Sequence, residues 1–303
     1  HMNIFGLNPV VVFGSDEQKK RMLPSLIAGK DKACSAVTEP NVGLDTLKLK
    51  TKAVREGDRY VLSGQKIWIS TAQVANKMLI LARTTPLEQV SRRTEGLTLF
   101  YTDLDRRFID VREIPKMGRS AVDSNELFIE NFPVPAADRI GEEGKGFQCI
   151  LHGMNPERIL IGAEAIGLDR AALRKAAAYA KERIVFDRPI GQNQAIQHPL
   201  AACWMALEAA NLMALKAASL YDRGEPCGIE ANATKYLGGE ACFKACETAL
   251  MTHGGMGYAK EFHVERYLRE SLMTRIAPIT PHLILSFIAE KARSEEHTSE
   301  LQS

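Results

Sequence analysis

Hydrophobic and polar residues alternate along the first half of the chain, whereas apolar residues recur with a helical period along the second half. Between Ala33 and about Ile140, alternating runs and short, nearly continuous apolar runs are separated by loops rich in glycine, proline and charge. Alternation with a period of two is typical of strands that bury one face. After residue 70 the expected strands are residues 78–82, 97–101, 108–114 and 126–129. This half of the chain is therefore predicted to form one antiparallel β-domain.

The pattern changes after Gly144 to long amphipathic segments. The first covers residues 147–180 and is expected to break at Asn155 and Pro156, where the asparagine can cap a renewed helix and the proline can take its first position. Three further helices, each with an apolar and a polar face, are expected over 195–221, 229–252 and 264–274. The predicted fold class is α+β, an antiparallel β-domain followed by an α-helical bundle domain.

Composition narrows the class of protein. The chain has 303 residues, a formal net charge of +2 and six cysteines. Its length suits about two domains, and its mixed charge argues against nucleic-acid binding. Since no apolar run approaches the roughly 18 residues of a membrane span, no span is predicted. Cys242 and Cys246 lie one helical turn apart without further ligands beside them, so packing is favoured over a metal site.

The candidate chemistry is densest in residues 35–70, where three alternating runs predict a β-meander. The runs break at residues 56–58 and again at Ser63 and Gly64. Trp68 and Ser70 are two residues apart on a strand and therefore share a face. An aromatic wall beside a hydroxyl suits a flat heterocycle. A tryptophan that only covers the sheet explains the same residues, so both interpretations stay open here.

The turn that precedes this strand offers further ligand-binding groups. Residues 38–43 contain Pro40, Asn41 and Gly43, which fix or permit the unusual backbone angles of a tight loop. Such a loop can direct its N–H groups and the Thr38 hydroxyl towards one edge of a ligand. An ordinary turn between strands is the alternative.

Several short motifs in this order and spacing resemble the acyl-CoA dehydrogenase family, a family of flavoproteins. The resemblance covers roughly residues 9–291 and rests on VTEP at 37–40 with Gly43 and Asp45, GQKIWIS at 64–70, Arg183, Phe186 and Gly191, and GGMGY at 254–258. It implies four regions: a remnant of an N-terminal helical domain at 1–32, a flavin-binding β-domain at 33–140, a helical bundle at 141–292, and a foreign tail at 293–303 without fixed structure. Within the first region, Ser15 with Gln18 predicts a capped helix that ends near Gly29.

The resemblance also implies a reaction, the FAD-dependent removal of two hydrogens from an acyl-CoA thioester. A base takes the proton at Cα while hydride passes from Cβ to the flavin. Glu157 matches the base of the isovaleryl- and long-chain-type branch, while Asn155, Arg158 and Leu44 match substrate-contacting positions. The alternative is that Glu157 only favours a helix N-terminus as a first-turn acid. Pro278 stands where other branches place their base, which removes a backbone N–H as well.

Cofactor positions carry over in two groups. The residues that match contacts to flavin in the same subunit are Val37, Thr38, Trp68 and Ser70, with Thr280 and His282 towards its phosphates and adenine. The residues that match contacts from a neighbouring subunit are Arg183, Phe186, Ile190, Asn193, Gln194, Met251, Gly254 and Gly255. The resemblance therefore implies a homodimer or homotetramer, with acyl-CoA as substrate and an electron-transferring flavoprotein as electron acceptor, in the cytoplasm or a mitochondrial matrix. A non-catalytic relative that binds acyl-CoA or FAD and an acyl-CoA oxidase are the competing interpretations.

Overall fold

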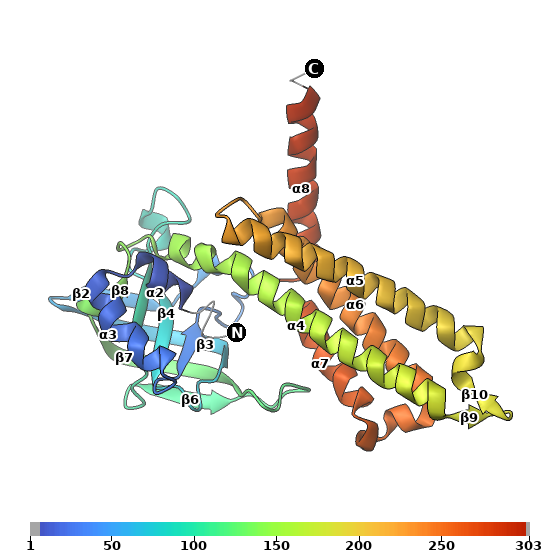
Figure 1. Ribbon diagram of the computed structural model, residues 1–303. Coiled ribbons are helices and arrows are strands. Elements are labelled where there is room, and N and C mark those ends of the chain that lie inside the picture. The colour runs from blue at the N-terminus through green and yellow to red at the C-terminus, as the bar shows by residue number, and fades with distance from the viewer. Residues whose placement is uncertain (1–6, 301–303) are drawn as a thin grey trace. The chain divides into compact units, whose positions relative to one another are not determined.

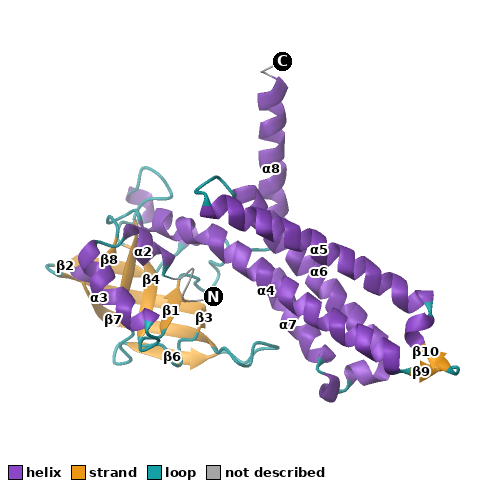
Figure 2. Cartoon of the chain, viewed as in Figure 1, coloured by secondary structure: helices purple, strands orange, loops and turns teal. Residues whose placement is uncertain are grey.

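The computed structural model describes residues 7–300, with side chains up to residue 291, and the chain divides into two compact units between Met154 and Asn155. The first unit contains a sheet with two covering helices, and the second is helical (Figures 1 and 2). The division lies later than the predicted boundary at residue 140. Cys149 and Ile150, in the first turns of the long helix that follows, are buried in the core of the sheet unit.

The sheet of the first unit has the strand order β6-β7-β3-β2-β4-β5-β8, with β1 paired to β4. Its strands are β1 (Ala33–Ala36), β2 (Lys52–Glu56), β3 (Arg59–Ser70), β4 (Lys77–Arg83), β5 (Leu97–Asp103), β6 (Ile109–Glu113), β7 (Ser124–Pro135) and β8 (Arg139–Ile140). Most neighbours are antiparallel, as predicted, but β1 pairs parallel with β4, and Lys52 of β2 pairs parallel with Arg83. The sheet is therefore mixed. A loop of residues 37–51 separates β1 from β2, and of the predicted meander only the hairpin of β2 and β3 is present.

The predicted break at Ser63 and Gly64 is wrong, because β3 runs through it as one strand of 12 residues with shifts of register after Leu62 and after Lys66. Gly64 is required there by a close approach rather than by a turn. A Cβ atom on Gly64 would lie 2.7 Å from Cα of Thr51. A glycine inside a strand often marks such an approach.

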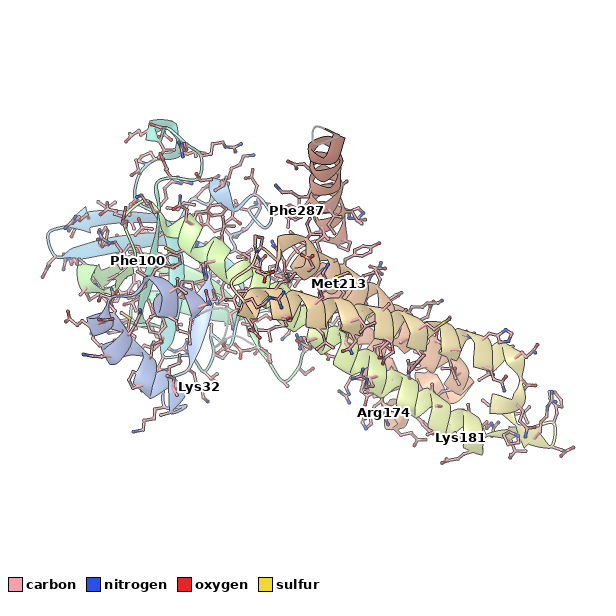
Figure 3. All side chains as sticks on the ribbon, turned by 45° about the horizontal axis from the view of Figure 1, so that its top comes forward. Lys32, Phe100, Arg174, Lys181, Met213 and Phe287 are labelled. Atoms are coloured by element: carbon pink, nitrogen blue, oxygen red, sulfur yellow. The ribbon has the colours of Figure 1, made fainter. Side chains whose placement is uncertain are left out.

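Both faces of β4 and β5 are buried, which explains their nearly continuous apolar sequence. Met78, Ile80 and Phe100 belong to one hydrophobic cluster, whereas Leu79 and Leu81 belong to another; Phe100 is labelled in Figure 3. The second cluster is completed by α2 (Asn8–Phe13) and α3 (Asp16–Ile27). The capping box of Ser15 and Gln18 is confirmed, and α3 ends just before Gly29, which adopts a φ of 70°.

The second unit is a helical bundle, so the predicted α+β fold class is confirmed. Its helices are α4 (Gly146–Glu182), α5 (Gln194–Asp222), α6 (Gly228–His253), α7 (Val264–Ile276) and α8 (Pro281–Glu300), with a short hairpin of β9 (Ile184–Val185) and β10 (Arg188–Pro189) after α4. Short 3₁₀ helices lie at Thr46–Lys48, Leu87–Gln89, Ala136–Asp138, Ile190–Gln192, Gly254–Tyr258 and Lys260–Phe262. The stretch of residues 293–300, predicted to lack fixed structure, is helical, since no glycine or proline follows Pro281 to stop α8. Residues 301–303 lie outside the described part.

The predicted break in the first long helix is also wrong, because α4 continues through Pro156. Asn155 and Glu157 consequently lie in the helix interior and not at a helix start. A proline inside a helix removes one hydrogen bond to the carbonyl four residues earlier, here that of His152. The burial of Pro156 and Glu157 indicates that tertiary packing outweighs this local cost.

Two segments meet the length and hydropathy expected of a membrane span: α5 alone, and α7 with residues 281–291 if they are taken as one span across a 43° bend. Both signals are marginal. α5 packs along α6 within the bundle, and its Leu207 and Ala210 are buried with Ile166 of α4. Bundle helices with one apolar face pass the same test, so neither segment is taken as a span.

Candidate active site

Glu157 is a buried carboxyl group in the interior of α4. Its side chain is 7% exposed, and it forms no hydrogen bond or ion pair with the residues that the structure describes. Burial raises the pKa of this carboxyl to about 7, although the Arg158 charge acts in the opposite direction. Because it lies well inside α4, a role at a helix N-terminus does not explain its presence. A shielded carboxylate with a pKa near neutrality is suited to accept a proton.

The neighbours of Glu157 in sequence are polar and partly buried. Burial lowers the pKa of Arg158, opposed by Glu157, and the Arg158 Nε atom is buried without a hydrogen-bond partner among the described residues. Burial raises the pKa of the Cys227 thiol, just before α6, against a hydrogen bond from the Asn155 side chain, and Asn155 does not cap a helix. The guanidinium is therefore left with an unused donor, which a ligand can satisfy. Leu44 lies in the other unit, in the loop after β1, and is 52% exposed.

The loop between α7 and α8 is held by a buried lysine that sequence reasoning missed. Lys235 of α6 is 1% exposed, and its Nζ atom donates hydrogen bonds to the carbonyls of Arg275 (2.8 Å) and Ile279 (2.7 Å). Thr280 follows as the residue before α8, where its hydroxyl accepts a hydrogen bond from the Leu283 N–H. The sequence signal for Lys235 was only one lysine within an apolar helical pattern, which also describes a solvent-facing residue.

In the sheet unit, the predicted flavin-facing residues lie on two adjacent segments. Val37 and Thr38 follow β1, and the Thr38 carbonyl accepts a hydrogen bond from the Ile67 N–H (3.0 Å) on β3. Trp68 and Ser70 end β3 with Ile69 buried between them, and Trp68 is 56% exposed. The hydroxyls of Thr38 and Ser70 form no hydrogen bond within the described residues. These two segments thus carry an exposed indole and two unused hydroxyls.

Trp68 adopts a φ of 61°. Left-handed backbone is rare for bulky residues. The register between β3 and β7 shifts between Lys66 and Ile69, so Trp68 lies in a bulge. Strain of this kind concentrates at ligand-binding positions.

The second predicted cofactor group gathers around the far ends of α4 and α6. Phe186 and Asp187 form the two-residue turn of the β9–β10 hairpin, both with positive φ, and Phe186 is 93% exposed. Arg183 and Gln194 are exposed, and Ile190 begins the 3₁₀ turn of Ile190–Gln192.

The side-chain amide of Asn193, a predicted cofactor residue, is used within this turn. Its Oδ1 accepts from Arg188 (2.6 Å), and its Nδ2 donates to the Ile190 carbonyl (3.0 Å). These bonds hold the turn in shape, and a cofactor contact of Asn193 stays a prediction.

The remaining residues of this group end α6. Met251 is 70% exposed, and Gly254 has a φ of 59° at the helix C-terminus, followed by exposed Gly255. The ring of His253 stacks on Tyr179 of α4 with centroids 4.3 Å apart, so the two helix ends lie side by side. Glu157 and Glu182 are about 38 Å apart along α4 at the usual helical rise. The structure thus separates this second group of predicted cofactor residues from Glu157.

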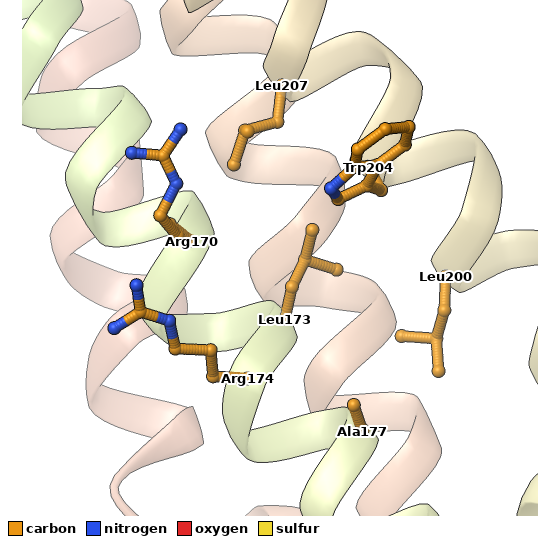
Figure 4. Close-up of a pocket in the computed structure, with 7 residues that line it drawn as sticks. All are labelled: Arg170, Leu173, Arg174, Ala177, Leu200, Trp204 and Leu207. Carbon is orange, nitrogen blue, oxygen red and sulfur yellow. The ribbon is translucent and has the colours of Figure 1, made fainter.

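Other features of the bundle match no predicted site. A shallow groove between α4 and α5 is lined by Arg170, Leu173, Arg174, Ala177, Leu200, Trp204 and Leu207 (Figure 4). Cys242 and Cys246 are buried as free thiols, and within the described ranges no cluster of His, Cys, Asp or Glu side chains can hold a metal ion.

The fold and these motifs together define an oxidoreductase of the flavoprotein type. The family model of the acyl-CoA dehydrogenase middle domain matches residues 34–132, and that of the C-terminal domain matches residues 144–290. The chain belongs to the acyl-CoA dehydrogenase family.

Individual relatives and solved structures support this family membership. An acyl-CoA dehydrogenase of Bacillus subtilis is 36% identical over 272 residues, which are 89% of this chain and 71% of that protein. The butyryl-CoA dehydrogenase structure from Megasphaera elsdenii has a TM-score of 0.90 at 31% identity, covering 94% of this chain and 74% of that one. An FAD complex of PigA has a TM-score of 0.88 at 29% identity, and the match covers 94% of this chain and 73% of that one.

Proposed function

We propose that this chain uses Glu157 to remove the Cα proton of an acyl-CoA thioester while hydride leaves Cβ. The observation that carries this proposal is the position of Glu157, buried inside α4 without a partner and with its pKa raised to about 7. A base of this kind is ionised to a useful degree near neutrality and basic enough to accept a proton. The chain is an FAD-dependent oxidoreductase, and FAD supplies the acceptor for the hydride.

The residues present suit this cofactor. Trp68 offers an exposed indole face for a flat ring, and the unused hydroxyls of Thr38 and Ser70 offer hydrogen-bonding groups of the type that flavin heteroatoms need. Thr280 and His282 stand at the N-terminus of α8, where the helix dipole favours a phosphate. Exposed Arg183 provides a planar fork suited to a pyrophosphate.

A second copy of the chain is part of the proposal. Arg183, Met251 and the glycines after α6 lie at the opposite end of the bundle from Glu157, about 38 Å away along α4. One cofactor held beside Glu157 does not reach them within the same chain. A homodimer or homotetramer, in which this end serves the cofactor of a neighbour, gives them a role.

The substrate and the electron acceptor are proposed from chemistry and from relatives. The free Nε donor of Arg158 suits an oxygen of the acyl-CoA. Since Pro278 has no N–H, the thioester oxygen must be held by other donors, among which a ribityl hydroxyl of the flavin is our choice. An electron-transferring flavoprotein is the proposed acceptor. Among the relatives are a subunit of a caffeyl-CoA reductase–Etf complex, 35% identical, and a structure titled as an electron-transferring flavoprotein of Acidaminococcus fermentans.

An oxidase is the second candidate, because a prolyl acyl carrier protein oxidase, AnaB, has a TM-score of 0.90 at 32% identity. Anaerobic mixing of the FAD-loaded chain with a series of acyl-CoAs tests the main proposal, which predicts bleaching of the flavin absorbance by at least one member. Admission of oxygen then separates the two candidates. Rapid recovery of the absorbance indicates an oxidase, whereas recovery only with an electron-transferring flavoprotein indicates a dehydrogenase. A flavin that no acyl-CoA bleaches contradicts both and supports a non-catalytic relative.

A further inference from the structure

A fully buried ion pair joins the loop after β1 to strand β3. Nζ of Lys66 lies 3.0 Å from Oε1 of Glu39, and the side chains are 0% and 5% exposed. Neither residue has a role in the reaction proposed above. A buried pair is weak evidence for stability, because removing two charges from water costs about as much as their attraction returns. The position of this pair therefore needs another reason.

The lysine binds the loop as well as the carboxylate. Its Nζ atom donates to the carbonyl of Val37 (3.0 Å) and to that of Leu81 on β4 (2.8 Å), in addition to Glu39. Three donors of one ammonium thus meet three acceptors. An apolar side chain of similar size would fill this space but would leave two buried carbonyls unsatisfied.

The glutamate fixes the same loop from its other side. Its Oε2 and Oε1 atoms accept hydrogen bonds from the N–H groups of Lys50 (2.5 Å) and Thr51 (2.8 Å), which lead into β2. Between the two ends, the Thr38 carbonyl is held by the Ile67 N–H (3.0 Å). Three consecutive residues, Val37 to Glu39, are each tied to Lys66 or Ile67.

The strand that holds residues 37–39 through Lys66 and Ile67 continues directly into Trp68, whose backbone is left-handed. Lys66 and Ile67 hold the strand immediately before it. Immediately after it, the Ile69 carbonyl accepts a hydrogen bond from Nδ2 of Asn125 (2.9 Å), whose side chain is fully buried. A bulky residue keeps a φ of 61° only where its surroundings fix the backbone on both sides. The ion pair supplies one of these two anchors.

We infer that Lys66 and Glu39 are positioning residues for FAD, which fix the Val37–Thr38 edge and the Trp68 indole in one mutual arrangement. Neither residue touches the flavin in this account. They act through Val37, Thr38 and Trp68, in the way that residues behind a binding group set its orientation. The inference rests on the assignment of FAD as cofactor.

The test compares four forms of the chain in a Trp204→Phe background, which leaves Trp68 as the only tryptophan of the two in the sequence. They are the otherwise unchanged chain, Lys66→Met, the double variant Lys66→Met with Glu39→Gln, and a control double variant. The control is Arg21→Met with Asp138→Asn, which removes another ion pair of the sheet unit (2.8 Å) that contacts neither Val37 nor Trp68. Measured quantities are the melting temperature, the Kd for FAD, the visible circular dichroism of the bound flavin, and the fluorescence anisotropy of Trp68 without FAD.

Lys66→Met should lower the melting temperature, because it leaves the Glu39 charge buried and unpaired. The double variant removes that charge and should recover part of the loss, because the Val37 and Leu81 carbonyls still lack the lysine donor. Its Kd for FAD should nevertheless stay weaker by about tenfold or more, the range found when residues behind a ligand-binding group are lost. The flavin dichroism should change and the Trp68 anisotropy should fall, while the control keeps both signals and a Kd within about twofold.

A double variant that is folded and binds FAD with unchanged Kd, dichroism and anisotropy would overturn the inference. If Lys66→Met alone does not fold, the double variant still decides. If the otherwise unchanged chain binds no FAD, the assignment of FAD as cofactor is wrong. If all four forms bind FAD equally, only the positioning role of Lys66 and Glu39 is wrong.

Discussion

A Cβ atom on Gly162 of α4 would lie only 2.5 Å from Cγ2 of Thr234 on α6. The two helices approach so closely there that Gly238 Cβ would likewise meet the Gly162 carbonyl oxygen at 2.9 Å. Gly162 lies between one and two turns after Glu157, and Thr234 precedes the loop-holding Lys235. This contact therefore fixes the helix of the proposed base against the helix that holds the α7–α8 loop.

Gly162→Ala should destabilise the chain by about 1–3 kcal/mol, the usual cost of overpacking a core. Thermal unfolding measures it. The matched control is Gly167→Ala on the same helix, where a Cβ atom meets nothing within 4 Å. That change should be neutral or stabilise the helix by up to about 1 kcal/mol. Equal melting temperatures for the two variants would show that the close approach is not maintained.

Asp169 predicts an unusual pH dependence of stability. Its side chain is 1% exposed, and neither carboxyl oxygen has a hydrogen-bond partner among the described residues. Burial raises its pKa to about 7, against the opposing charge of Arg170. A carboxyl whose pKa is higher in the folded state is stabilising when protonated, so this contribution is complete below the unfolded pKa of about 3.9 and is lost as the pH rises to about 7.

Asp169→Asn should therefore match the unchanged chain near pH 4 and exceed it at pH 8, by up to about 4 kcal/mol in free energy of unfolding. Denaturant unfolding across this range measures the difference. The exposed Asp58→Asn serves as control and should show no such trend. An Asp169→Asn advantage that is constant with pH would contradict the burial of a titrating carboxyl.

Lys235→Met should cost about 2–4 kcal/mol of stability, because two partly buried carbonyls, those of Arg275 and Ile279, lose their donor. Lys244→Met on the same helix removes only the exposed pair with Glu247 and should cost less than about 0.5 kcal/mol. Similar losses for both lysines in chemical denaturation would mean that the loop is held by other contacts.

The sequence predicted the fold where local signals agree with the tertiary structure. The capping box of Ser15 and the apolar run of residues 78–82 both led to the observed elements. The breaks predicted at Pro156 and Gly64 were wrong. Each residue usually ends a helix or a strand, but here each lies inside a continuous element. Packing around α4 outweighs the lost hydrogen bond of Pro156, and Gly64 is explained only by Thr51, which approaches from the loop before β2.

The candidate site was predicted from motifs, and the structure supplied what motifs do not contain. The position of Glu157 in sequence is compatible with a first-turn acid, and only its burial inside α4 removes that explanation. The partners of Lys66 and Lys235 are 15 to 44 residues away in sequence. A lysine gives no sign in sequence of whether its ammonium faces water or a buried carbonyl.

The pH dependence of flavin reduction follows from Glu157. Since burial raises its pKa to about 7, the ionised base is scarce at pH 5.5 and predominant at pH 8.5. The rate constant for reduction by acyl-CoA should rise about tenfold per pH unit below 7 and level off above it. A rate that does not change between these pH values would place the proton acceptor elsewhere.

The central claim, that Glu157 is the base, is tested most directly by stopped-flow reduction of the FAD-loaded Glu157→Gln variant with acyl-CoA. The amide keeps the shape of the side chain and cannot accept the proton, so FAD should bind as before while the reduction rate falls by at least about a hundredfold. Glu182→Gln, at the end of the same helix, is the control and should reduce at the unchanged rate. A Glu157→Gln variant that is reduced as fast as the unchanged chain would contradict the assignment.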